Sequence, residues 1–242
     1  SEMCIRDSPN LYLIDVQSDQ VSEVESVLRK NDLPVLESVP MVTMRVQSIG
    51  GVEVGKVKGV PGWVGRREFR STYRDRLNFT ETILEGDFAT GIEAPEGLVP
   101  ISLEEKIARD MKVGIGDKIT MDVQGLAIET QVTSIRKVDW SRFNLNFFMV
   151  FPPGVLEDAP GFNVVTTRTP SPQASGDLQR ELAEKFANVT AIDLTQILKE
   201  VRDILGDIST VITVLAGFTV LAGLPILLGT LMNGRDAVSY TH

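Results

Sequence analysis

The hydrophobic pattern near the start of the chain predicts a strand, a helix and a second strand. Residues 10–16 (NLYLIDV) form a short apolar run, and residues 18–32 carry apolar side chains at helical spacing. That spacing joins Val21, Val24 and Leu28. Residues 33–46 then place valines at intervals around Pro40, which predicts a second strand that is broken or bent at the proline.

The same order of elements recurs before the last apolar stretch. Residues 162–167 are strand-like, residues 172–187 are helical and residues 188–192 are again strand-like. The helix places Leu178, Leu182 and Phe186 on one side. A ferredoxin-like split fold requires two such β-α-β units, so the sequence predicts an α+β fold with residues 48–161 inserted between its halves.

Local signals predict two helix starts and β-rich structure in the insertion. Ser18 or Asp19 is expected to cap the first helix, because a short side-chain oxygen accepts a free backbone N–H of the first turn. In ISLEEKIARDM, Ser102 and Glu105 have the spacing of a capping box. A β-meander is predicted after it, with turns at Gly116-Asp117 and Gln124-Gly125.

Five arginines are concentrated between Arg66 and Arg76. A basic cluster of this kind can bind anions or nucleic acid. Glu68 and Asp75 interrupt it, however, and the whole chain has a formal net charge of −9. We therefore interpret the stretch as an exposed strand of mixed charge.

Aromatic side chains gather just before a diproline turn. Residues 147–151 predict a strand that ends at PPG, residues 152–154. The aromatic residues are Trp140, Phe143, Phe147 and Phe148. Packing in the core accounts for such a cluster. The alternative is a groove that receives an apolar ligand or a partner.

The longest apolar stretch lies near the end of the chain, where no charged residue occurs in residues 208–234. Its centre, VITVLAGFTVLAGLPILLGTLM, has 22 residues. As a helix it would extend roughly 33 Å, which matches the hydrocarbon thickness of a bilayer. Residues 208–234 are therefore predicted to form one transmembrane helix.

The helical spacing of this segment begins earlier, in residues 193–207. Steps of three and four residues join apolar positions there and continue across the predicted membrane boundary. We name five of these positions the coupling seam: Leu194, Ile197, Val201, Ile204 and Ile208. We expect a stalk helix, capped by Asp193 and Gln196, that is continuous with the span.

A second stripe of the predicted span carries small side chains. We name it the small-residue face, and its members are Ser209, Ala216, Thr219, Gly223 and Thr230. Small residues let another helix approach closely within a membrane, so the stripe predicts a helix–helix contact. Because small residues are common in spans, an ordinary lipid-facing surface is the alternative.

Composition excludes several classes of chemistry. The 242 residues include one cysteine, Cys4, and one histidine, His242, each close to an end. Histidine-dependent triads and most zinc sites need residues that the sequence between them lacks. Phosphate-binding glycine motifs are also missing, and the acidic balance argues against a nucleic-acid binder. We expect no cofactor, no metal site and no catalytic residue, although carboxylate-pair chemistry is open.

Several stretches together resemble the FtsX-like permeases of ABC transporters, in particular the YbbP-like members. They are the diproline stretch at residues 139–160, EEKIARDMKVGIGDKITMDVQG, VTSIRKVDW and NVTAIDLTQILKEVRDIL. The part before the span resembles the MacB-like periplasmic core domain, which has an AcrB-porter-like subdomain and an inserted β-rich one. The resemblance covers about residues 10–235.

The resemblance implies the membrane subunit of a bacterial ABC transporter in the inner membrane. Its partners would be a separate cytoplasmic ATPase, further transmembrane helices of the permease and a periplasmic protein. Family members have membrane helices before and after the core domain, so we expect a fragment whose ends look non-native. The expected parts are a non-native end at 1–8, an extracytoplasmic core domain at 9–192, the stalk at 193–207, the span at 208–234 and a truncated end at 235–242. The porter-like halves are about 10–47 and 162–192.

Two other classes of protein fit the same pattern. A membrane-tethered binding or sensor module would need one span and no ATPase. An enzyme on a membrane anchor would need two buried carboxylates that face each other in a cleft.

Overall fold

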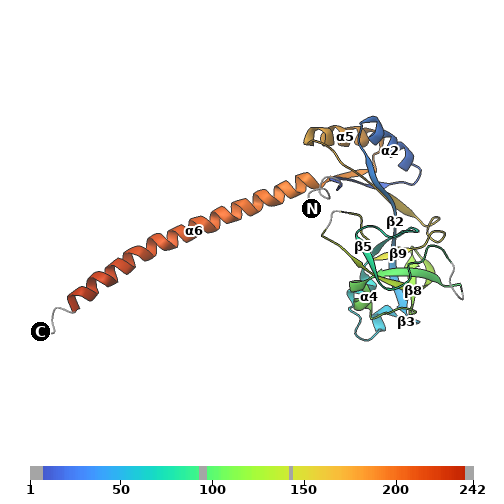
Figure 1. Cartoon of the computed structure of the whole chain (residues 1–242), viewed down its shortest axis with the longest axis horizontal. Coiled ribbons are helices and arrows are strands. Elements are labelled where there is room, and N and C mark those ends of the chain that lie inside the picture. The colour runs from blue at the N-terminus through green and yellow to red at the C-terminus, as the bar shows by residue number, and fades with distance from the viewer. Residues whose placement is uncertain (1–7, 93–96, 142–143, 238–242) are drawn as a thin grey trace. The chain divides into compact units, whose positions relative to one another are not determined.

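The computed structural model describes residues 8–92, 97–141 and 144–237 (Figure 1). The chain divides into two units, the first ending at Asp193 and the second beginning at Leu194. The first unit is built on an eleven-stranded sheet with the order β11-β1-β10-β2-β4-β9-β6-β8-β5, while β3 and β7 pair off this path. The second unit is the helix α6.

One half of the sheet comes from the two ends of the first unit. Its strands are β1 (Leu11–Val16), β2 (Val35–Ile49), β10 (Gly161–Thr167) and β11 (Thr190–Asp193). They lie in the order β11-β1-β10-β2, with every neighbouring pair antiparallel. The helices α2 (Val21–Lys30) and α5 (Pro172–Lys185) lie side by side over these strands (Figure 1). They bury Val24, Leu28, Leu178 and Leu182 against Leu11 and Leu13.

Strand β2 is continuous, so the predicted break at Pro40 is wrong. Its residues 35–42 pair with β10, its residues 42–44 pair with β4, and its residues 45–49 pair with β7. At Pro40 the strand is paired with β10 on one side only, because its pairing with β4 begins at Val42. The unpaired side needs no backbone N–H, so a proline is tolerated there. The strand thereby runs through both halves of the sheet.

The other half of the sheet is formed by the insertion. Its elements are β3 (Val52–Glu53), η1 (Val54–Lys56), α3 (Trp63–Arg66), β4 (Phe69–Tyr73), β5 (Glu81–Gly86), β6 (Val99–Glu104), α4 (Glu105–Met111), β7 (Lys118–Val123), β8 (Leu126–Val138) and β9 (Met149–Phe151). They enclose a second core that includes Met44, Phe69, Leu103, Met121 and Phe151.

The predicted meander is correct for one hairpin only. Strands β7 and β8 are antiparallel, and Gln124 and Gly125 at their turn have φ angles of 52° and 96°. Both residues thus lie in the left-handed region that a tight two-residue hairpin turn requires. Strand β8 also pairs with β5, which is antiparallel to it, and with β6, which runs parallel to it. The insertion is therefore a mixed sheet.

Both predicted helix caps are wrong. Helix α2 begins after Gln20, whose side chain makes no capping bond to the helix. Helix α4 begins after Glu104, whose carboxylate accepts a hydrogen bond of 3.0 Å from the backbone N–H of Ile107. Ser102 lies in β6 and its hydroxyl is bonded to that of Ser134. The strand extends farther than its sequence pattern indicates, which shifts the helix start.

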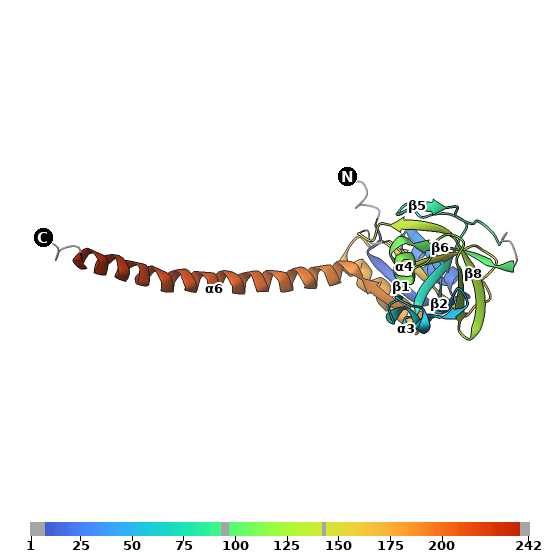
Figure 2. The same ribbon diagram turned by 90° about the horizontal axis from the view of Figure 1, so that it is seen from below.

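Helix α6 (Leu194–Ala237) is one uninterrupted helix of 44 residues (Figures 1 and 2). Within the described chain, its residues 194–220 are the one helical segment long and apolar enough to cross a membrane. The predicted stalk and the start of the predicted span are thus continuous.

Candidate functional site

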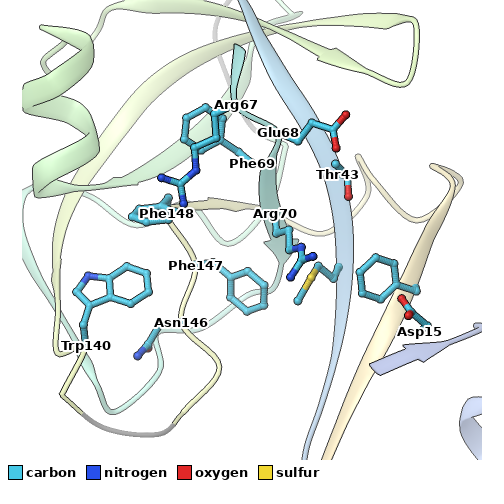
Figure 3. A pocket seen from close by; sticks show the side chains of 12 residues that line it. Asp15, Thr43, Arg67, Glu68, Phe69, Arg70, Trp140, Asn146, Phe147 and Phe148 are labelled. Atoms are coloured by element: carbon cyan, nitrogen blue, oxygen red, sulfur yellow. The ribbon is translucent and has the colours of Figure 1, made fainter. Parts of the chain in front are cut away.

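A surface cavity of about 600 Å³ lies where β2 and β4 meet the segment before β9 (Figure 3). Its apolar lining is formed by Met41, Phe69, Trp140, Phe147, Phe148 and Phe162. Its polar lining is formed by Asp15, Thr43, Arg67, Glu68, Arg70 and Asn146. Residues from β1, β2, β4 and β10 thus meet residues that the sequence analysis identified as an aromatic cluster.

Three of the four predicted groove aromatics line this cavity. The rings of Trp140 and Phe148 are in contact, with centroids 4.9 Å apart. Phe147 is buried and belongs to a small core with Met41 and Val164. Phe143, the fourth, lies outside the described residues. The prediction of core packing is correct for Phe147, which is buried, while Trp140 is 46% exposed, and a role as a groove for a ligand or partner stays a prediction.

Arg67 stacks on the aromatic rings at one end of the cavity. Its guanidinium carbon lies 4.9 Å from the ring centroid of Phe148 and 5.5 Å from that of Phe69. Trp63 contributes a third ring at 5.7 Å. A guanidinium over an aromatic face is attracted by the negative face of the ring. The contacts with these rings keep the positive charge of Arg67, an exposed side chain, beside the cavity.

The arginine-rich stretch is not the exposed strand that the sequence suggested. Its strand β4 is internal, paired with β2 on one side and β9 on the other. Phe69 and Ser71 are buried, while Glu68 and Arg70 face outward. The alternation of a strand, which sends successive side chains to opposite faces, explains why charges and core residues share one segment.

A buried ion network is bonded to the segment before β9 that carries the aromatic residues. The carboxylate of Glu81 accepts hydrogen bonds from Arg74 at 2.6 Å and from Arg136 at 3.0 Å. Arg136 also donates to the backbone carbonyl of Phe147 at 2.7 Å. Both side chains of the Glu81–Arg136 pair are fully buried. Their bonds therefore act in a dry environment, where hydrogen bonds to charged groups are strong.

Burial also shifts the pKa values of Arg136 and of Tyr12. Desolvation lowers the pKa of Arg136 to about 10, and the charge of Glu81 opposes that change. Burial raises the pKa of the nearby Tyr12 to about 12, and the charge of Glu37 adds to the effect. Glu37 in turn accepts a hydrogen bond from the backbone N–H of Leu145 at 3.2 Å. The segment before β9 is thus held by two buried or half-buried acidic groups.

Neither Glu81 nor Arg136 was predicted from the sequence as a functional residue. A signal for Arg136 was present, because it alternates with Val132, Ser134 and Val138, all of which face inward from β8. An arginine at an inward position of a strand indicates a buried ion pair, since an unpaired charge there would be too costly. Its acidic partner comes from β5, 55 residues earlier in the chain, and no local pattern names it.

The buried carboxylates have structural partners. Glu81 is bonded to two arginines and Glu104 caps α4. Of the carboxylates that line the cavity, Glu68 is paired with Arg45 at 2.5 Å. A search of the described residues finds no group of three His, Cys, Asp or Glu side chains able to hold a metal ion.

Side chains of α6 show how a helix can carry hydroxyls through an apolar environment. Thr210, Thr213 and Thr219 each donate a hydrogen bond to the carbonyl four residues earlier, at 2.8–3.0 Å. These hydroxyls are therefore satisfied within the helix itself, as hydrocarbon surroundings require.

The predicted surfaces of α6 lie on this helix as follows. In the coupling seam, Leu194 is half-buried and Ile197, Val201, Ile204 and Ile208 are exposed. In the small-residue face, Ser209, Ala216 and Thr219 are exposed and Gly223 is intermediate. Thr230 belongs to the helix, but its side chain lies outside the described ones. The roles of both surfaces stay predictions.

The chain has a relative among curated proteins. Over 195 residues, which are 81% of this chain, it is 26% identical to the "Uncharacterized ABC transporter permease YbbP" of Escherichia coli K12. The chain is similar to ABC transporter permeases of the YbbP type. This confirms the resemblance inferred from the sequence. The chain spans 23% of the length of that permease.

No family model matches the chain, and the solved structures that are similar to it include the following two. A permease domain from Porphyromonas gingivalis aligns with a TM-score of 0.40 and 10% identity, covering 76% of this chain and 89% of that one. The periplasmic region of MacB from Actinobacillus actinomycetemcomitans aligns with a TM-score of 0.43 and 10% identity, covering 82% and 95%.

Proposed function

We propose that the chain is part of the membrane subunit of a bacterial ABC transporter, and that α6 transmits movement between the membrane and an extracytoplasmic domain. The observation that carries this proposal is the uninterrupted helix α6, which follows directly after β11 in the sequence. The similarity to the permease YbbP supports the same assignment. Hydrolysis of ATP would occur in a separate cytoplasmic subunit.

The domain organisation of this proposal follows the strand order. The strand order β11-β1-β10-β2, with α2 and α5 beside it, supports the proposal of two β-α-β units in a split, porter-like fold. We assign residues 9–192 to the core domain, with residues 48–161 as its β-rich insertion. Residues 193–207 would be the stalk and residues 208–234 the span, in the inner membrane. Residues 9–207 would then be periplasmic.

A helix can transmit a displacement because its backbone hydrogen bonds make it stiff along its axis. Binding of ATP would bring the partner ATPases together and shift the membrane helices. The shift would move the core domain, which would export or extract a substrate or signal to a periplasmic partner. Such coupling requires an element with two arrangements that both ends can bias. The coupling seam and the small-residue face are the surfaces on which neighbouring helices would act.

The proposal is tested by interrupting α6 after Arg202 in the complete permease assembled with its ATPase. A seven-residue Gly-Ser insertion should abolish the ATP-dependent movement of the core domain, measured by the distance between spin labels, while ATP hydrolysis continues. The matched control inserts seven Ala, Glu and Lys residues, which add about two helical turns and preserve the phase. Undiminished movement with the Gly-Ser insertion would contradict the proposal.

The cavity favours one alternative, a membrane-tethered binding or sensor module that works without an ATPase. A surface cavity of about 600 Å³ has the size of a small-molecule site. Purification of the complete protein from membranes separates the two functions. Co-purification of an ATPase supports the permease, and its absence under mild extraction supports the sensor.

A further inference from the structure

Two arginines bring positive charge to the cavity between β2 and β4. The exposed side chains of Arg67 and Arg70 both line it. Within the described part of the chain, neither guanidinium forms an ion pair with a carboxylate. Arg67 contacts aromatic rings, and the neighbouring carboxylate of Glu68 is paired with Arg45. Asp15 lies at the far end of the cavity from Trp140 (Figure 3). The aromatic half of the cavity is therefore cationic.

The way Arg67 is held leaves its hydrogen-bonding groups available. Its guanidinium carbon lies 4.9 Å from the ring centroid of Phe148, and this contact is with the π-system of the ring. The contact does not occupy the N–H groups with a hydrogen-bond acceptor. The N–H groups of a guanidinium form a fork that matches a carboxylate. A stacked arginine without an acidic partner is thus a preorganised receptor for an anionic group.

The wall beside these arginines is apolar and incompletely covered. Trp140 is 46% exposed and contacts Phe148, while Met41, Phe147 and Phe162 line the adjoining part of the cavity. Covering an exposed indole with an apolar group removes apolar surface from water, which is favourable. A purely apolar ligand would also desolvate the two guanidinium groups without compensation.

We propose that this cavity binds a small amphiphilic carboxylate, with the carboxylate on Arg67 and Arg70 and the apolar chain against Trp140 and Phe148. The charge selects an anion over a neutral or cationic amphiphile. Hydrogen bonds of Arg136 and Asn146 hold the aromatic wall in place. Arg136 donates to the carbonyl of Phe147 in a buried bond, and Asn146 accepts a partly buried bond of 2.8 Å from Thr80. This inference does not depend on the coupling role of α6.

The test uses 8-bromooctanoate, whose bromine quenches tryptophan fluorescence. Trp63 and Trp140 are the two tryptophans of the chain, so the variant W63F reports on Trp140 alone. The full chain is reconstituted in phosphatidylcholine nanodiscs, and quenching in empty nanodiscs containing a soluble tryptophan analogue corrects for partition into lipid. We expect saturable quenching by 8-bromooctanoate, and binding at least about tenfold weaker for 8-bromooctanol and 8-bromooctylamine, because neither carries the negative charge that pairs with the two guanidinium groups.

Substitutions locate the binding. In the W63F background, R70Q and R67Q should each weaken binding of 8-bromooctanoate about tenfold. The matched control R109Q removes an exposed arginine of α4 that does not line the cavity, and should leave binding unchanged. Unchanged thermal unfolding of R70Q shows that its fold is intact.

Three results would overturn the inference: equal binding of the alcohol and the carboxylate, quenching that does not saturate, or unchanged affinity in both R67Q and R70Q. None of them bears on whether α6 transmits movement, so the two proposals fail independently.

Discussion

At the scale of single residues, the cavity depends on a charge pair that no ligand would touch. Glu81 and Arg136 are fully buried, and Arg136 reaches the backbone carbonyl of Phe147. Removing one partner of a buried pair leaves the other charge without its compensation, which costs far more than the loss of an exposed pair. The position of the aromatic segment is thus coupled to the stability of the domain.

The substitution R136M should therefore lower the free energy of unfolding by about 3 kcal/mol. It should also loosen the segment that carries Trp140, which is measurable as a red shift of tryptophan emission in the W63F background. Chemical denaturation of the full chain in a nonionic detergent gives the first quantity.

The control for this substitution is R109M. Arg109 forms an exposed pair with Glu105 one helical turn earlier, and its side chain is 72% exposed. Its loss should cost no more than about 0.5 kcal/mol. If R136M and R109M had equal effects, the buried network would not be the support of the cavity wall.

At the scale of elements, helices α2 and α5 are joined through one carboxylate. Glu181 of α5 accepts hydrogen bonds from Lys185 at 2.9 Å, from Asn31 at 2.9 Å and from Lys30 at 3.3 Å. The bonds from Lys185 and then Asn31 contribute most to lowering the pKa of Glu181 from its ordinary value of 4.5 to about 2. These bonds act as a clip between α2 and α5, and the clip is strongest while the carboxylate of Glu181 is ionised.

We expect the clip to fail between pH 4.5 and pH 2. In that range the unfolded chain binds a proton at Glu181 that the folded chain does not, so stability falls as the pH falls. The variant E181Q should lose less stability than the parent between pH 6 and pH 3 in thermal unfolding. E184Q, at an exposed carboxylate of the same helix, is the control and should follow the parent. Identical pH dependence of E181Q and the parent would refute this role of Glu181.

At the scale of the whole chain, an acidic, strand-rich unit is followed by a helix with a long apolar segment. Residues 194–220 of α6 have the length and composition to cross a membrane, and the hydroxyls of Thr210, Thr213 and Thr219 are bonded within the helix. A bilayer would remove the apolar side chains of such a helix from water. We therefore expect α6 to be the part of the chain that holds it in the membrane.

Two arginines in the apolar segment should release the chain. The variant L215R/V220R adds about 5 kcal/mol to the cost of insertion, so a large part of the chain should become extractable by alkaline carbonate. The control I197R/V201R places the same charges before the predicted span and should remain in the membrane. Equal extraction of both variants would show that residues 208–234 do not form the span.

The sequence by itself determined the features that depend on neighbours along the chain. Periodicity placed α2, α5 and β10 within a few residues, because burying one face of an element imposes its spacing on the sequence. The absence of charge over residues 208–234 and the regular apolar spacing before them likewise indicated one long helix. The aromatic groove could be suggested from Trp140, Phe147 and Phe148 because they lie within nine residues of one another.

Only the tertiary structure decided the features that depend on contacts between distant segments. Arg74, which directly follows β4, and Arg136 of β8 meet Glu81 of β5. Strand β4 is internal because β9 pairs with it from 78 positions later, at Thr72 and Val150. The cavity requires Met41 and Phe162 from one half of the sheet to meet Trp140 from the other. Burial and charge pairing are set by what folds against a residue, and that information is spread over the whole chain rather than held in its local pattern.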